Sequence, residues 1–154
     1  MQPIHPMLSP LPAIGRIFLA LIFVLSGIGK LGTIGATSAH MASAGIPYAN
    51  DLVWGAVVLE LGGGILLIVG LLTRLVGIAF FFYTLTLGVI FHAYWAMTGA
   101  AAHSQFSIFY EHFAIMGGML YVVAFGAGPY SVDAMIWGRH PQAALPPPHP
   151  QPAE

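Results

Sequence analysis

A carboxylate stands inside one of the most apolar stretches of this sequence. Glu60 lies within "LVWGAVVLELGGGILLIVGLLTR", residues 52–74, where Arg74 is the only other charged residue. An unpaired charge in hydrocarbon costs several kcal/mol, so a carboxylate there must pair, take up a proton or serve a function. Four other ionisable side chains in or beside apolar stretches are candidates for a shared polar site: Lys30, His92, Glu111 and His112.

Three kinds of chemistry are open to this set. His and Glu side chains bind divalent metals, but no HxxxH or ExxH pair occurs, and the adjacent Glu111 and His112 diverge by about 100° on a helix. We therefore predict no metal site. A quinone or similar lipophilic ligand needs an apolar slot with a few polar groups. The set could also lock helices together without any ligand.

A quinone site could be assembled from the residues near these positions. His92, His112 and Lys30 could donate hydrogen bonds to the ring carbonyls, and Glu60 or Glu111 could carry protons. Four aromatic residues are candidates to flank the ring: Trp54, Phe91, Tyr94 and Trp95. Aromatic residues are also common at membrane interfaces, where they act as anchors.

Composition places the chain in a membrane. Only 6% of the 154 residues are charged and 58% are hydrophobic, whereas soluble domains carry about 25% charged residues. The net charge of −1 gives no indication of nucleic-acid binding. Cysteine is absent, which excludes disulfides, thiol catalysis and cysteine metal ligation in this chain.

Four apolar segments have the length that a bilayer requires. About 20 helical residues cross a hydrocarbon core of about 30 Å. Glycine and proline mark the breaks between the segments, which predicts an all-α, polytopic bundle of four transmembrane helices. The first segment has a signal-peptide look, but few positive charges precede it, so we expect a retained helix. The predicted spans are residues 11–31, 52–72, 75–95 and 106–125.

The basic residues predict the orientation of these spans. If the spans alternate, Arg16, Arg74 and Arg139 share one side of the membrane and Lys30 lies on the other. The positive-inside rule then places both termini in the cytoplasm. The loops 32–51 and 96–105 face outward, and residues 36–44 of the first loop are expected to form a short interfacial helix.

Depth along the spans brings the ionisable residues together. Lys30 ends the first span, Glu60 lies about 13 Å into the second, and His92 lies about 27 Å along the third. Glu111 and His112 fall in the first turns of the fourth. All five residues are therefore expected in the outer half of the bundle as one buried polar cluster, with no comparable set in the inner half.

Several motifs make the sequence similar to a known family. The segments "LALIFVLSGIGKL", "MASAGIP", "VVLELGGGILLIVGLLTRL", "FHAYW" and "HFAIMGGML" occur in this order. Together they resemble the DoxX family of small bacterial integral membrane proteins over about residues 13–133. The motif positions carried by the resemblance are Lys30, Glu60, Arg74 and His92, whereas Glu111 and His112 come from the depth argument alone.

The resemblance implies a four-helix domain, residues 1–137, in the cytoplasmic membrane. The Pro-rich segment 138–154 lies outside the match, and we expect it to be disordered. Family members are associated with quinone reduction, redox stress and oxidoreductase assemblies. The leading hypothesis is a redox-associated, quinone-interacting subunit with oxidoreductase partners; the alternative is a non-catalytic structural or assembly subunit. The sequence leaves open whether the protein is an enzyme.

Overall fold

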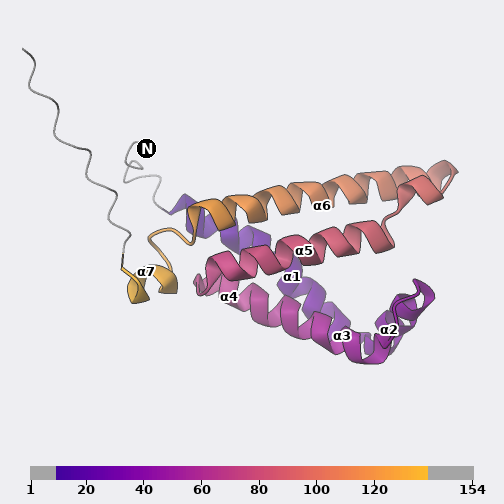
Figure 1. The fold of residues 1–154 in the computed structure, drawn as a ribbon, viewed down its shortest axis with the longest axis horizontal. Helices are drawn as coiled ribbons and strands as arrows, with labels where there is room; N and C mark the ends of the chain where they lie inside the picture. Colours follow the sequence, from indigo (N-terminus) through magenta and orange to yellow (C-terminus); the bar gives the residue numbers. More distant parts are fainter. Residues whose placement is uncertain (1–9, 139–154) are drawn as a thin grey trace, which may run out of the picture.

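The fold consists of helices throughout the part of the chain that the structure describes. This computed structural model describes residues 10–138, and every regular element in that range is helical. Four helices are long and apolar enough to cross a membrane, which confirms the predicted fold class (Figure 1). The elements are α1 (Leu11–Gly32), α2 (Ile34–Ser43), α3 (Ala49–Val58), a π-helical turn (Leu59–Gly63), α4 (Gly64–Val69), α5 (Thr73–Phe91), a 3-10 turn (Tyr94–Ala96), α6 (Gly99–Phe125) and α7 (Val132–Ile136).

The helix boundaries differ from the predicted spans where local backbone preferences decide. Pro12 lies in the first turn of α1, where a missing amide proton costs nothing. Gly70 ends α4 two residues before the predicted end, because its φ of 73° is left-handed. The fourth span begins at Gly99 rather than near residue 106. Part of the predicted outer loop 96–105 is therefore helical, and a helix also forms over most of residues 36–44 as predicted.

We call the two ends of the bundle the Arg74 end and the Lys30 end, after a residue at each. At the Arg74 end, the α4–α5 turn, α7 and the start of α1 come together (Figure 1). At the opposite end, the Lys30 end, α1 leads into α2 and α3, while α5 is joined to α6 (Figure 1).

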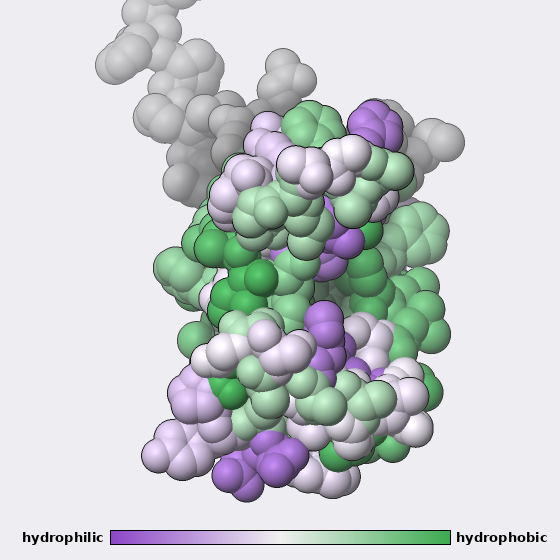
Figure 2. Space-filling view, turned by 90° about the vertical axis from the view of Figure 1, so that its right-hand side faces the viewer, coloured by the Kyte–Doolittle hydropathy of each residue, from purple (hydrophilic) through white to green (hydrophobic). Residues whose placement is uncertain are grey.

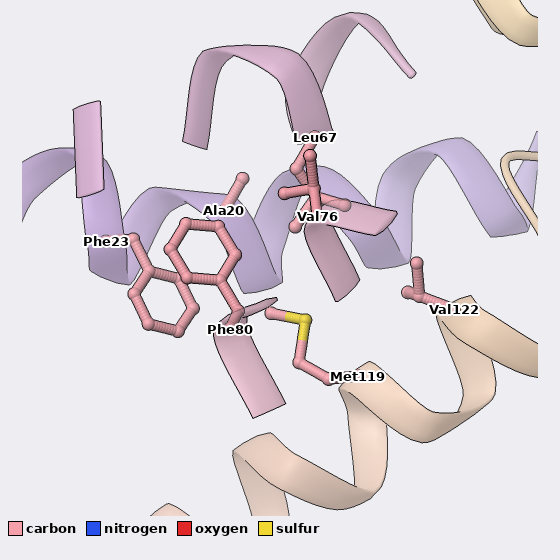
Figure 3. Close-up of a cluster of buried hydrophobic side chains, with 7 residues drawn as sticks. All are labelled: Ala20, Phe23, Leu67, Val76, Phe80, Met119 and Val122. Atoms are coloured by element: carbon pink, nitrogen blue, oxygen red, sulfur yellow. The ribbon is translucent and has the colours of Figure 1, made fainter. Parts of the chain in front are cut away.

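The hydrophobic core joins all four spans toward the Arg74 end. Phe23 of α1 stacks on Phe80 of α5 with ring centroids 3.8 Å apart. Met119 of α6 is fully buried beside them (Figure 3). The buried side chains of the cluster are Ala20, Phe23, Leu67, Val76, Phe80, Met119 and Val122.

The bundle opens toward the Lys30 end. The α1–α3 side and the α5–α6 side diverge in that direction (Figure 1). The space-filling view of this end shows a hollow between two lobes, with hydrophilic residues visible inside it (Figure 2). Polar groups at this end can therefore be reached from outside the bundle, whereas the core residues cannot.

A second polar arrangement, which the sequence analysis did not predict, stabilises the Arg74 end. Arg16 is only 4% exposed, and its guanidinium donates to the backbone carbonyls of Ala127 and Tyr130. Asp133 of α7 accepts from the backbone N–H groups of Leu72 and Thr73 at 2.8 and 3.0 Å. The carboxylate thus satisfies amides at the N-terminus of α5, where the helix dipole favours negative charge. The expectation that the half of the bundle opposite Lys30 holds no comparable polar set is therefore wrong.

Candidate functional site

A buried ion pair between α1 and the π-helical turn is the centre of the candidate site. Lys30 Nζ lies 2.8 Å from both carboxylate oxygens of Glu60. The Glu60 side chain is 1% exposed, whereas that of Lys30 is 21% exposed. Charge-assisted hydrogen bonds of this length are about twice as strong as neutral ones. The ion pair therefore offsets the cost of placing the Glu60 carboxylate in an apolar span.

Two hydroxyl groups complete the coordination of this pair. Tyr83 of α5 donates to Glu60 Oε1 at 2.7 Å, and Ser26 donates to the same oxygen at 3.2 Å. Lys30 Nζ also donates to Ser26 Oγ at 2.6 Å. We call Ser26, Lys30, Glu60 and Tyr83 the polar tetrad. It links the α1–α3 side of the bundle to α5.

Local backbone structure positions Glu60. Residues Leu59–Gly63 form a single π-helical turn inside an otherwise α-helical span. Such turns contain one extra residue and are frequent at functional sites. The glycines that follow permit close packing: a Cβ on Gly64 would lie 2.6 Å from Val24 Cγ2, and one on Gly63 would lie 2.9 Å from Phe80 Cζ. Small residues at these positions let the helices approach each other.

The two histidines of the predicted cluster lie together on the α5–α6 side. The rings of His92 and His112 have centroids 4.8 Å apart. His92 Nδ1 lies 2.6 Å from Gln105 Oε1, and His112 Nδ1 lies 2.8 Å from the carbonyl oxygen of Ile108. Neither histidine makes a hydrogen bond to the tetrad in the described structure. They form a separate polar group at the same end of the bundle.

Glu111 is not part of the buried cluster. Its side chain is exposed and makes no hydrogen bond or ion pair with the residues that the structure describes. Because α6 starts at Gly99, Glu111 and His112 lie more than three turns into the helix rather than in its first turns. Arg74 is also exposed, with one long contact of 3.4 Å to the carbonyl oxygen of Ala124.

The candidate ring-flanking residues do not gather around Glu60. Tyr94 and Trp95 pack edge-to-face against each other and against Phe109 of α6. Phe91 stacks on His40 of α2 at 5.1 Å, and Trp54 is 52% exposed.

No metal centre is evident among residues 10–138, since no three His, Cys, Asp or Glu side chains converge there. A pocket of about 440 Å³ lies between α2 and α3. Its lining does not include the tetrad; it consists of Ser38, Ala39, Ala42, Ile46, Tyr48, Ala49, Asn50 and Asp51. We take the tetrad as the candidate site, because it contains a buried ion pair with two hydroxyl partners near the end of the bundle that opens.

Ser26 and Tyr83 are the site residues that the sequence did not reveal. Ser26 precedes Lys30 by one helical turn, and that spacing was the available signal. Tyr83 had no signal, because tyrosines are frequent in spans of this kind. The tail predicted over residues 138–154 lies almost wholly outside the described residues, as does Arg139.

The apolar helices and the buried ion pair between them define a polytopic helical membrane protein. The family model described as DoxX matches residues 11–93, more than half of the chain. The chain belongs to the DoxX family, as its motifs predicted.

Two relatives from Escherichia coli strain K12 are similar over most of their length. Inner membrane protein YphA is 38% identical over 120 residues, which cover 78% of this chain and 86% of the relative. Inner membrane protein YqjF is 30% identical over 124 residues, covering 80% and 89%. No solved structure matches the chain.

Proposed function

We propose that this protein is a subunit of a complex in the cytoplasmic membrane. It would bind the headgroup of a membrane-soluble quinone next to the polar tetrad, in the hollow at the Lys30 end. The relatives named as inner membrane proteins support the location. The observation that carries the binding proposal is the tetrad itself. A buried charged pair with two hydroxyl partners lies at the open end of a bundle whose other end is closed by a hydrophobic core.

Accessibility supports a binding role for the tetrad. Glu60 is inaccessible, but the Lys30 side chain retains 21% exposure at the end of the bundle that opens. A quinone headgroup is flat and apolar with two polar oxygens, so it suits an apolar slot with a few fixed polar groups. The same geometry presents the ring to oxidoreductase partners at the membrane surface, and the Lys30 end then faces outward.

A structural or assembly role is the second candidate. Lys30 has three N–H donors, and the two Glu60 oxygens and Ser26 Oγ accept all of them. A fully satisfied pair is what a helix-locking device requires. In that case the hollow would hold lipid, and no quinone would affect the stability of the protein.

Ligand-dependent stability separates the two candidates. A ligand that binds only the folded state raises the thermal midpoint by mass action. We expect a short-chain ubiquinone or menaquinone, tested in both redox forms, to raise the midpoint of the purified wild-type protein. Glu60→Gln and Tyr83→Phe should each reduce the rise, measured against the unliganded midpoint of the same variant.

The matched control is Asp51→Asn, which makes the same acid-to-amide change at an exposed position of α3. It should leave the rise intact. If wild-type protein shows no rise with either redox form, the structural role is favoured and the quinone proposal fails.

A further inference from the structure

Four large apolar side chains are exposed around α7, at the Arg74 end of the bundle (Figure 1). Tyr130 precedes α7 and is 61% exposed, Met135 and Ile136 of α7 are 77% and 59% exposed, and Trp137, directly after α7, is 59% exposed. The hydrophobic core cluster includes none of them. We call these four residues the α7 patch. An exposed apolar group of this kind marks a contact surface.

Hydrogen bonds fix the level of α7 along the bundle. Asp133 accepts from the backbone N–H groups of Leu72 and Thr73 at 2.8 and 3.0 Å. Its own N–H donates to the carbonyl oxygen of Gly70 at 2.8 Å. Gly70 and Leu72 lie in the turn between the second and third spans, and Thr73 begins the third span. The α7 patch is therefore held at the level where two spans reach the membrane surface.

A second set of contacts holds the chain that leads into α7. The buried guanidinium of Arg16 donates to the carbonyl oxygens of Ala127 and Tyr130. Ser131 caps α7 by accepting from the N–H of Ala134 at 3.1 Å. The backbone of Tyr130 is thus tied to a buried residue of α1, while its side chain remains exposed. These contacts attach the segment to the bundle without covering the α7 patch.

The neighbouring surface is apolar and belongs to the spans. Leu72, whose N–H bonds to Asp133, is 44% exposed, and Leu75 in the first turn of α5 is 62% exposed. Exposed leucines on a membrane-spanning helix contact acyl chains. Tryptophan and tyrosine are enriched one level further out, where their rings lie among the lipid headgroups. The α7 patch therefore continues a lipid-facing surface and has the composition of a membrane interface.

We infer that α7 is an interfacial anchor, in which the α7 patch contacts the headgroups and the first acyl carbons of the leaflet at the Arg74 end. Asp133 and Arg16 hold this anchor on the bundle. The partner is lipid rather than a second copy of the chain, because both the level and the aromatic content of the patch fit the interface. Side chains at this level also remain within reach of water. The inference is independent of the proposed quinone binding.

The fluorescence of Trp137 tests this inference. With Trp54→Phe and Trp95→Phe, the full-length chain keeps Trp137 as its single tryptophan. The protein is placed in lipid nanodiscs, whose two faces are both open to the solution. Interfacial side chains lie about 5–10 Å into the headgroup and acyl boundary, so lipids brominated near the headgroup should quench Trp137 about twofold more than lipids brominated near the chain ends.

Ile22→Trp provides the control for depth, in a chain whose native tryptophans are all replaced by phenylalanine. Ile22 is 49% exposed near the middle of α1, so lipids brominated near the chain ends should quench this reporter more strongly. Ile136→Asp should reduce the lipid quenching of Trp137 by about half, because a carboxylate is costly in the acyl region. Ser43→Asp, which adds the same charge at the exposed end of α2, should leave it unchanged. Thermal midpoints show whether each variant remains folded.

Three results would overturn the inference. Quenching of Trp137 by acrylamide in solution but by neither brominated lipid would show that the α7 patch faces water. Protection from acrylamide and from both lipids would show that protein covers the patch. Lipid quenching that stays at its full strength in Ile136→Asp would show that this side chain does not contact acyl chains. None of these results bears on quinone binding.

Discussion

At the scale of single residues, Lys30 and Glu60 have unequal environments, and the inequality has energetic consequences. Glu60 is 1% exposed, while the Lys30 side chain is 21% exposed. Removing the cation leaves a carboxylate with two hydroxyl donors and no neutralising charge. Breaking a buried pair in this way costs more than the pair contributes when intact.

We expect Lys30→Met to lower the free energy of unfolding by about 3–5 kcal/mol. Combining it with Glu60→Gln should recover most of the loss, because the carboxylate that lacked a partner is then neutral. Reversible unfolding in detergent measures both variants. Arg74→Met is the control, since Arg74 is exposed and its loss should cost about 0.5 kcal/mol or less. An equal loss of unfolding free energy in Lys30→Met and Arg74→Met would contradict a buried ion pair.

The same residues show what sequence reasoning can reach. Counting residues along spans gives depth, and depth was enough to put Lys30 and Glu60 at the same level. It does not give the direction in which a side chain points, which is why Glu111 was grouped with residues that face elsewhere. Arg16 was read only as a topology signal, because a basic residue near a span end is usually one.

At the scale of the elements, the run Gly62–Gly63–Gly64 contains both packed and open positions. A Cβ on Gly64 would overlap Val24 of α1, whereas one on Gly62 would meet no atom within 4 Å. Three consecutive glycines therefore have different roles, which their sequence alone does not distinguish.

Gly64→Ala should destabilise the protein by about 1–3 kcal/mol, as overpacking does in a close helix contact. Gly62→Ala should be neutral or stabilising by up to about 1 kcal/mol, because alanine favours a helical backbone over glycine. Thermal or denaturant unfolding of the two variants side by side provides the comparison. A larger loss for Gly62→Ala would show that α1 does not approach the span as described.

Element boundaries were predictable only in part. Apolar length located all four spans, but the prediction ran the second span past Gly70, where the helix ends. The extension of α6 back to Gly99 was missed because "GAAAHSQ" carries little hydrophobicity, yet its alanines favour helix. The π-helical turn at Glu60 depends on packing against α1 and α5, which local sequence does not specify.

At the scale of the whole molecule, the orientation in the membrane decides which compartment the hollow faces. Three of the four basic residues favour a cytoplasmic Arg74 end, and this remains a prediction. The chain offers no native thiol, so a single introduced cysteine reports its own side without background.

Ser43→Cys, at the exposed end of α2, should react with a membrane-impermeant thiol reagent added to intact cells. Met135→Cys, 77% exposed on α7, should react only after the membrane is permeabilised. The reverse pattern would turn the bundle over and direct the hollow toward the cytoplasm.

The π-helical turn sets the direction in which Glu60 points relative to the residues that follow it in the same span. The one surplus residue in Leu59–Gly63 rotates the side chains that follow the turn by one helical step, about 100°, relative to those that precede it. Deleting Gly62, where an added Cβ would meet no atom within 4 Å, should restore an uninterrupted α-helix. Glu60 and Leu67 could then no longer both face their present partners. A one-residue change in chain length would thus disconnect the ion pair from the core without altering any side chain that forms either.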